Sequence, residues 1–125
     1  MIDYGSNVLK INGKRLELMQ LPAVVSKILL PTDDMVVVRY SVADVKEKFD
    51  AKYRNVFAVN MQGEVLWQIE PSPFEQKIPP DGHIQRYAFQ NLWLTEDGKL
   101  MVDSHGIQFE VDAKTGKLSK GELAK

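Results

Sequence analysis

Apolar and polar residues alternate in several short runs along the chain, and this period of two predicts β-strands. Residues 107–112 alternate strictly, so that Ile107, Phe109 and Val111 fall on one face and polar residues on the other. This alternation is typical of a sheet with one face in water. In residues 35–40 apolar side chains fall on both faces, which predicts a central strand covered on both sides. We therefore expect a mainly β protein.

The strand pattern occurs twice. Residues 56–67 contain a strand, an Asn-to-Gly turn and a second strand, and residues 107–118 contain the same order with an Asp-to-Gly turn. The similarity extends upstream, because residues 29–37 match residues 93–101 in character. An internal repeat of this kind indicates repeated structural units. We expect two antiparallel meanders of four strands each, at 24–70 and 86–121.

Two further segments lie outside the repeat. Residues 1–20 predict an N-terminal hairpin, because Asn12-Gly13 readily adopts the positive φ angles of a tight turn. Residues 71–85 hold most of the six prolines of the chain, and we expect a long connection there, with neither helix nor central strand. The length of 125 residues suits a single domain spanning 1–125.

Residues 42–54 are a charged insertion in the first unit. Apolar residues recur in it at helical spacing, which favours one short helix at about 42–53, although a charged loop also fits the pattern. Such a segment is usually a solvated face, but insertions into repeats also tend to form binding surfaces.

The composition excludes several classes of function. Hydrophobic residues make up 44% and charged residues 26%, as in ordinary globular proteins. The net charge of −1 and the lack of a basic stripe argue against nucleic-acid binding. The chain has no cysteine, which excludes disulfides and thiolate chemistry. We see neither a signal peptide nor an apolar run of about 20 residues, so we expect a cytoplasmic protein without membrane contact.

The sequence has few residues that could form a catalytic or metal-binding site. His83 and His105 lie near turns, far apart in the sequence, and no nucleophile-elbow pattern surrounds Ser104. An enzyme acting through either histidine and a nearby acid is the weaker alternative. The acids at 33–34 and 96–97 occupy equivalent turns, where carboxylates accept backbone hydrogen bonds. We expect no enzyme, no cofactor and no metal site. Most strand aromatics should lie in the core, namely Phe57, Trp67, Phe89, Trp93 and Phe109.

Residues 112–117, Asp-Ala-Lys-Thr-Gly-Lys, resemble the turn signature of a quinoprotein-type β-propeller blade. Trp67 matches the docking tryptophan of such blades, whereas the second unit has Lys120 at that position. The resemblance implies two propeller-blade-like meanders. Two blades do not close a ring, so the sheets pack face to face, form one curled sheet, or pair between chains.

The whole chain is similar to a group of small bacterial single-domain proteins. The similarity lies in the opening residues 7–11, in the middle segments 55–60 and 63–69, and in the closing residues Asp112 and 115–117. Some members of the group are cytoplasmic immunity proteins of polymorphic or contact-dependent-inhibition toxin systems. The resemblance implies a non-enzymatic module that binds a toxin domain, as a monomer or homodimer. The alternative is a propeller-like small-molecule-binding or regulatory module completed by self-association.

The partner surface is predicted on the charged insertion at 42–54 and on the proline-rich segment. Tyr and Arg are the residue types most enriched at interface hot spots, and apolar residues on a proline-rich loop either cover the core or contact a partner. The candidate partner-binding residues are Lys46, Lys48, Phe49, Tyr53, Arg54, Phe74, Ile78 and His83.

Overall fold

The computed structural model describes residues 2–5, 8–16, 24–42, 53–73, 75–78, 83–119 and 122–123. All its regular elements within these ranges are strands, so the prediction of a mainly β protein is confirmed. Among the residues placed, no helix has the length and apolar character needed to cross a membrane. The strands are β1 (Ile2–Gly5), β2 (Val8–Ile11), β3 (Lys14–Leu16), β4 (Val24–Thr32), β5 (Met35–Ser41), β6 (Val56–Asn60), β7 (Val65–Gln68), β8 (Glu75–Ile78), β9 (His83–Arg86), β10 (Asn91–Leu94), β11 (Leu100–Ser104), β12 (Ile107–Val111) and β13 (Glu122–Leu123).

The strands form antiparallel sheets in simple meander order. The N-terminal sheet has the order β1-β2-β3, the central sheet β4-β5-β6-β7 and the second-unit sheet β10-β11-β12-β13, while β8 and β9 form a separate two-stranded hairpin. Both predicted four-stranded meanders are therefore present. The fourth strand of the second unit is short. Leu118 forms an isolated bridge to Val111, and β13 consists of Glu122 and Leu123.

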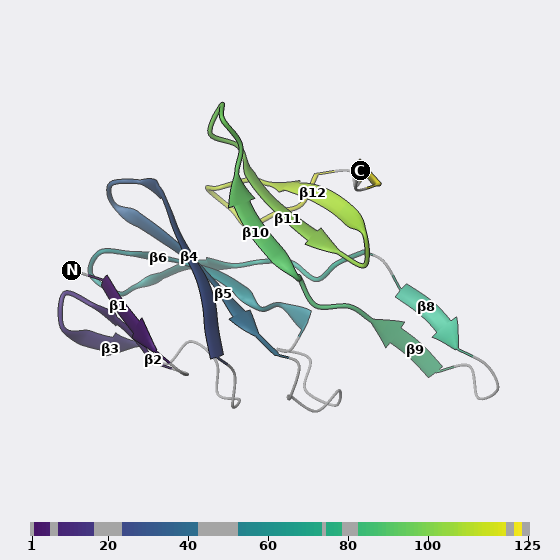
Figure 1. The fold of residues 1–125 in the computed structure, drawn as a ribbon, viewed down its shortest axis with the longest axis horizontal. Coiled ribbons are helices and arrows are strands. Elements are labelled where there is room, and N and C mark those ends of the chain that lie inside the picture. Colours follow the sequence, from purple (N-terminus) through teal and green to yellow (C-terminus); the bar gives the residue numbers. More distant parts are fainter. Residues whose placement is uncertain are drawn as a thin grey trace.

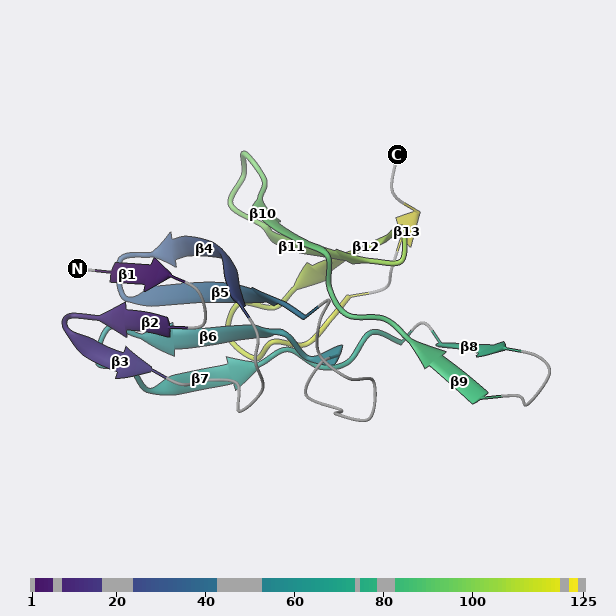
Figure 2. The ribbon, with the colours of Figure 1, turned by 60° about the horizontal axis from the view of Figure 1, so that its bottom comes forward.

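The three larger sheets pack face to face in layers, with the central sheet in the middle (Figures 1 and 2). Alternate residues of β5 serve the two sides. Val36 and Val38 belong to the core shared with the N-terminal sheet, whereas Val37 belongs to the core shared with the second-unit sheet. The prediction of a covered central strand at 35–40 is thus confirmed. Burying a side chain such as valine contributes about 1.5–3 kcal/mol, so this two-sided burial is a main source of stability.

Each layer contacts the turn of the next layer through its last strand. Leu16 at the end of β3 lies over Gly63 in the β6–β7 turn, where an added Cβ would be 2.9 Å from Leu16 Cδ2. Trp67 on β7 lies over Gly116, where an added Cβ would be 2.6 Å from Trp67 Cε3. The indole Nε1 of Trp67 also donates a 2.8 Å hydrogen bond to the carbonyl oxygen of Ala113. These two contacts fix the order of the layers.

The N-terminal segment differs from the expected hairpin by one additional strand. The predicted tight turn is present, with φ angles of 52° at Asn12 and 82° at Gly13, and β1 then pairs with the free side of β2. The aromatic prediction is largely confirmed. Phe57, Phe89 and Phe109 are buried, as is Trp67, whereas Trp93 is half-buried on the outer face of β10.

The proline-rich segment 71–85 is more regular than predicted. It contains β8 and most of β9, because its prolines lie outside these strands and leave the strand amides free to pair. The second unit, predicted to begin at residue 86, has its first strand, β10, only from Asn91. Ahead of β10, the Asn55 side chain bonds to the backbone of Phe89, and the backbone N–H of Gln90 donates to the carbonyl oxygen of Asp103 on β11. The predicted helix at about 42–53 falls mainly on residues 43–52, which lie outside the described residues.

Candidate functional site

Residues at the end of the 42–54 insertion form hydrogen bonds with residues on both sides of the β8–β9 hairpin, at one end of the central sheet. We call Arg54, Asn55, Gln68, Ile69 and Phe89 the root. Arg54 and Asn55 follow the 43–52 segment, Gln68 and Ile69 precede the β8–β9 hairpin, and Phe89 follows that hairpin. Residues that are distant in the sequence therefore meet at the root.

Asn55 is the centre of the root. Its side chain is fully buried, and Nδ2 donates to the carbonyl oxygens of Tyr40 at 2.7 Å and Phe89 at 2.9 Å. Its Oδ1 accepts a 3.0 Å hydrogen bond from the backbone N–H of Phe89. Both donors and an acceptor lone pair are thereby satisfied, which a buried amide requires. One side chain thus joins the end of β5, the start of β6 and the segment before β10.

Arg54 connects the root to the residues that precede the hairpin. Its Nε donates a 2.8 Å hydrogen bond to the carbonyl oxygen of Ile69, and Nη2 lies 3.4 Å from that of Gln68. Gln68 Nε2 donates in return to the carbonyl oxygen of Arg54 at 2.9 Å. The segment that follows residues 43–52 is therefore bonded directly to the strand that leads into the hairpin.

Arg39 of the central sheet holds Phe89, and Asn91 is held within the second-unit sheet. Arg39 Nε donates to the carbonyl oxygen of Phe89 at 2.8 Å, and Nη1 contacts Ser26 Oγ. Burial lowers the pKa of the Arg39 guanidinium from its ordinary value, and the nearby Asp103 carboxylate opposes this shift. Asn91 Nδ2 donates to both carboxylate oxygens of Asp103, at 3.1 and 2.9 Å.

The second-unit sheet holds the same segment from the other side. Ser104 is fully buried, and its Oγ donates toward the carbonyl oxygens of Ala88 at 3.2 Å and Tyr87 at 3.4 Å. The ring of His105 stacks on Tyr87 with a centroid distance of 4.0 Å and an interplanar angle of 28°. The base of the hairpin is thus fixed to two different layers.

The hairpin itself stands away from the three layers (Figures 1 and 2). Its strands pair without a bulge, from Glu75 opposite Arg86 at the base to Ile78 opposite His83 near the tip. Among the described strands, none adds to either edge. An isolated two-stranded hairpin is marginally stable in water, so the root contacts are what hold its base in position.

The structure separates the predicted partner-binding residues into three groups. Ile78 and His83 are brought together as a cross-strand pair of the hairpin. Tyr53 is only 7% exposed, and Arg54 donates to backbone carbonyls, so both support the frame beneath the predicted surface. The remaining candidates lie outside the described residues, namely Lys46, Lys48, Phe49 and Phe74.

Sequence reasoning missed the structural roles of Asn55 and Ser104. Asn55 precedes an apolar strand, as many surface asparagines do, and nothing in the sequence predicts that the chain would bury it completely. Ser104 was considered only as a nucleophile, whereas its hydroxyl bonds to the backbone carbonyls of Tyr87 and Ala88. Their roles depend on segments that the fold brings together.

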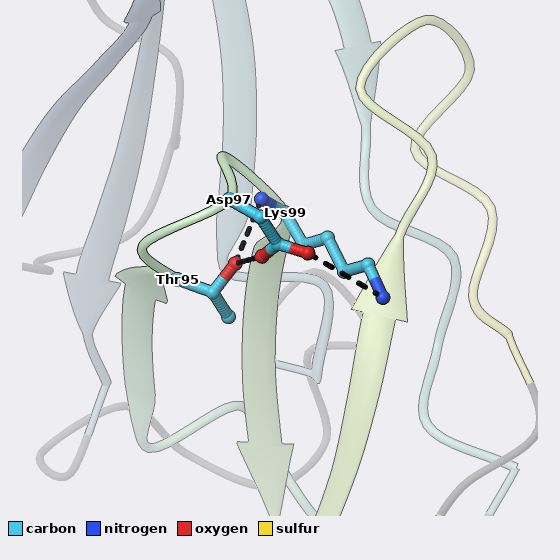
Figure 3. A network of polar contacts seen from close by, with 3 residues as sticks. All are labelled: Thr95, Asp97 and Lys99. Atoms are coloured by element: carbon cyan, nitrogen blue, oxygen red, sulfur yellow. Dashed lines mark hydrogen bonds and ion pairs between the residues drawn. The ribbon is translucent and has the colours of Figure 1, made fainter.

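In each of the two equivalent turns, one of the acidic residues accepts a hydrogen bond from a threonine side chain. Thr32 Oγ1 donates to Asp34 Oδ1 at 2.7 Å, and Thr95 Oγ1 donates to Asp97 Oδ1 in the second unit (Figure 3). The hydrogen bond from Thr95 lowers the pKa of the Asp97 carboxyl, and Lys99, whose Nζ is 3.8 Å from Asp97 Oδ2, adds to this effect. Across the described ranges, no three His, Asp or Glu side chains are grouped as metal ligands.

Comparison with known proteins places the whole chain in one family. No curated protein and no solved structure matches it. A family model matches residues 1–123, which include every layer, the root and the hairpin. The chain belongs to the family described as Domain of unknown function (DUF7957).

Proposed function

We propose that this chain is a non-enzymatic protein-binding module, and most concretely a cytoplasmic immunity protein that neutralises a cognate toxin domain. The observation that carries the proposal is the shared root. Arg54 and Asn55 bond the end of the 43–52 segment to both flanks of the β8–β9 hairpin. Arg54 and Asn55 are therefore bonded to the residues on both sides of the hairpin at one end of the central sheet.

The frame provides what a recognition surface needs. Binding is stronger when the contact elements are held in position before the partner arrives, because less conformational entropy is lost on association. No described strand pairs with either edge of the hairpin, which has little stability of its own, and a partner would supply the contacts that it lacks. The resemblance of the sequence to immunity proteins supports a toxin domain as the partner.

Binding to the product of the neighbouring toxin gene tests the proposal. The purified chain is titrated with the catalytically inactivated toxin domain, and we expect a stoichiometric complex and protection of cells that produce both proteins. A double substitution at the hairpin tip, Ile78→Asp with His83→Asp, should weaken binding by about tenfold or more, as expected for an interface centre. Glu64→Lys, in the exposed β6–β7 turn, is the matched control and should bind normally.

Two results would count against the proposal. If the folded chain fails to bind or protect against the neighbouring toxin domain, the immunity function is wrong. If binding occurs but the tip variant behaves like Glu64→Lys, the function holds and the hairpin is not its contact surface.

A further inference from the structure

The layered frame repeats one kind of joint, in which the last strand of a layer covers the turn of the next. Leu16 covers the turn at Gly63, and Trp67 covers the turn at Gly116. The corresponding turn of the N-terminal sheet is at Gly13, and no atom lies within 4 Å of a Cβ added there. Of these three turns, the one at Gly13 is therefore not covered by a described residue of a neighbouring layer.

The two end layers have outer faces of different chemistry, and no other described sheet packs on either of them. On the N-terminal sheet, the paired residues Lys10 and Arg15 are both exposed, opposite the face that buries Leu9 and Leu16. The register places Asp3 opposite Lys10, so this cross-strand row holds two bases and one acid. Its long aliphatic stems and charged ends suit an acidic surface that also offers apolar contacts.

The outer face of the second-unit sheet has the complementary character. Trp93, Met101 and Glu110 form one cross-strand row, in which Trp93 and Met101 are half-buried and Glu110 is exposed. Beside this row lies a hollow of about 320 Å³. Its lining residues are Thr95, Asp97, Lys99, Met101, Gln108, Glu110 and Ser119.

The hollow presents one net negative charge. Its carboxylates are Asp97 and Glu110, and its ammonium group is Lys99. Lys99 lies 3.8 Å from Asp97, which leaves the Glu110 carboxylate to face an incoming cation. An aromatic ring and a thioether beside an exposed carboxylate are groups that contact the stem and the charge of Arg or Lys.

We propose that the outer face of β10–β12 binds the outer face of β1–β3 of a second copy of this chain, head to tail. Lys10 and Arg15 of one copy then meet Glu110, Trp93 and Met101 of the other. The same order of layers, N-terminal sheet, central sheet and second-unit sheet, continues across the contact. A heterologous contact of this kind either closes into a ring or extends as an open array.

This association goes beyond the proposed immunity function. Neither end face includes the hairpin or the root, so a toxin domain and a second copy occupy different surfaces. A chain that binds no toxin can still associate, and a chain that stays monomeric can still bind its toxin.

Sedimentation velocity of the full chain over a range of concentrations tests the proposal. The wild type should form dimers or larger species as its concentration rises, and added salt should weaken them. Glu110→Lys alone and Lys10→Glu alone each place like charges across the contact, and should weaken association by about tenfold or more. Glu64→Lys changes an exposed charge in the β6–β7 turn of the central sheet, which belongs to neither end face, and should associate like the wild type.

A mixture of the two charge variants is the decisive measurement. In the mixture, the Glu110→Lys chain can bind by its altered face to the Lys10→Glu chain, and the unaltered faces also match, so association should return. Circular dichroism establishes that each variant is folded. The proposal is overturned if the wild type is monomeric throughout, if Glu64→Lys disrupts association as much as Glu110→Lys, or if mixing the folded variants restores nothing.

Discussion

Replacing Gly116 by alanine tests the contact that joins the central and second-unit sheets. Gly116 has a φ angle of +77°, and a Cβ built on it would lie 2.6 Å from Trp67 Cε3 and 2.8 Å from Trp67 Cδ2. The indole cannot simply withdraw, because it is 6% exposed and its Nε1 donates to the carbonyl oxygen of Ala113. The added methyl group therefore forces either the turn or the tryptophan to move.

The expected destabilisation has two parts. An alanine in the left-handed region costs about 1–2 kcal/mol. Overpacking in a filled core adds about 1–3 kcal/mol. Gly98 supplies the matched control, since its φ angle is +86° and nothing lies within 4 Å of its added Cβ. We expect Gly98→Ala to lose only the backbone part, so Gly116→Ala should be less stable by a further 1–3 kcal/mol or so.

Urea unfolding of the three proteins, followed by tryptophan fluorescence and circular dichroism, measures both losses. In a second step Trp67→Leu removes the ring that the new methyl group meets, and Gly116→Ala should then cost about as much as Gly98→Ala. Equal losses of stability for Gly98→Ala and Gly116→Ala in the chain that keeps Trp67 would refute the reasoning. That outcome would mean that the indole does not pack tightly on the turn.

Three further predictions concern the root and the turn. Asn55→Ala removes three buried hydrogen bonds, leaves the backbone N–H of Phe89 without its acceptor, and should destabilise the chain by roughly 3 kcal/mol in urea unfolding; a loss below about 1 kcal/mol would contradict this role. Arg54→Met should speed amide hydrogen exchange in residues 75–86, and unchanged protection there would show that the Arg54 contacts do not hold the hairpin base. Asp97 should titrate below the ordinary range of an aspartate, so its contribution to stability is present at neutral pH and is lost as the pH falls through its lowered pKa. In an NMR titration Thr95→Val should raise this pKa more than Lys99→Met does, and the reverse order would refute the assigned cause.

The pattern of the sequence predicted those parts of the fold that depend on local periodicity. Residues 35–40 have apolar side chains on both faces, and β5 is covered on both sides. The strict alternation in residues 107–112 likewise gives β12, with Phe109 and Val111 in the core and Glu110 exposed. Such patterns can be read directly because side chains of a strand alternate between two faces whatever lies beyond them.

The candidate site could be predicted only as two segments. Their position outside the repeat identified residues 42–54 and 71–85, but it did not predict the β8–β9 hairpin or the pairing of Ile78 with His83. Tyr53 was selected for its residue type, and tertiary packing buries it. Residue type indicates what a side chain can do, whereas burial depends on which distant segments pack around it.

By itself the sequence determined the mainly β class, the repeated meanders and the tight turns, because strand alternation and turn geometry act over a few neighbouring residues. Tertiary structure alone decided that the sheets stack in three layers and that Asn55 and Arg54 join segments far apart in the chain. Those contacts arise when separate apolar faces are buried against one another, and the polar groups enclosed with them must then find partners wherever the packed chain brings them.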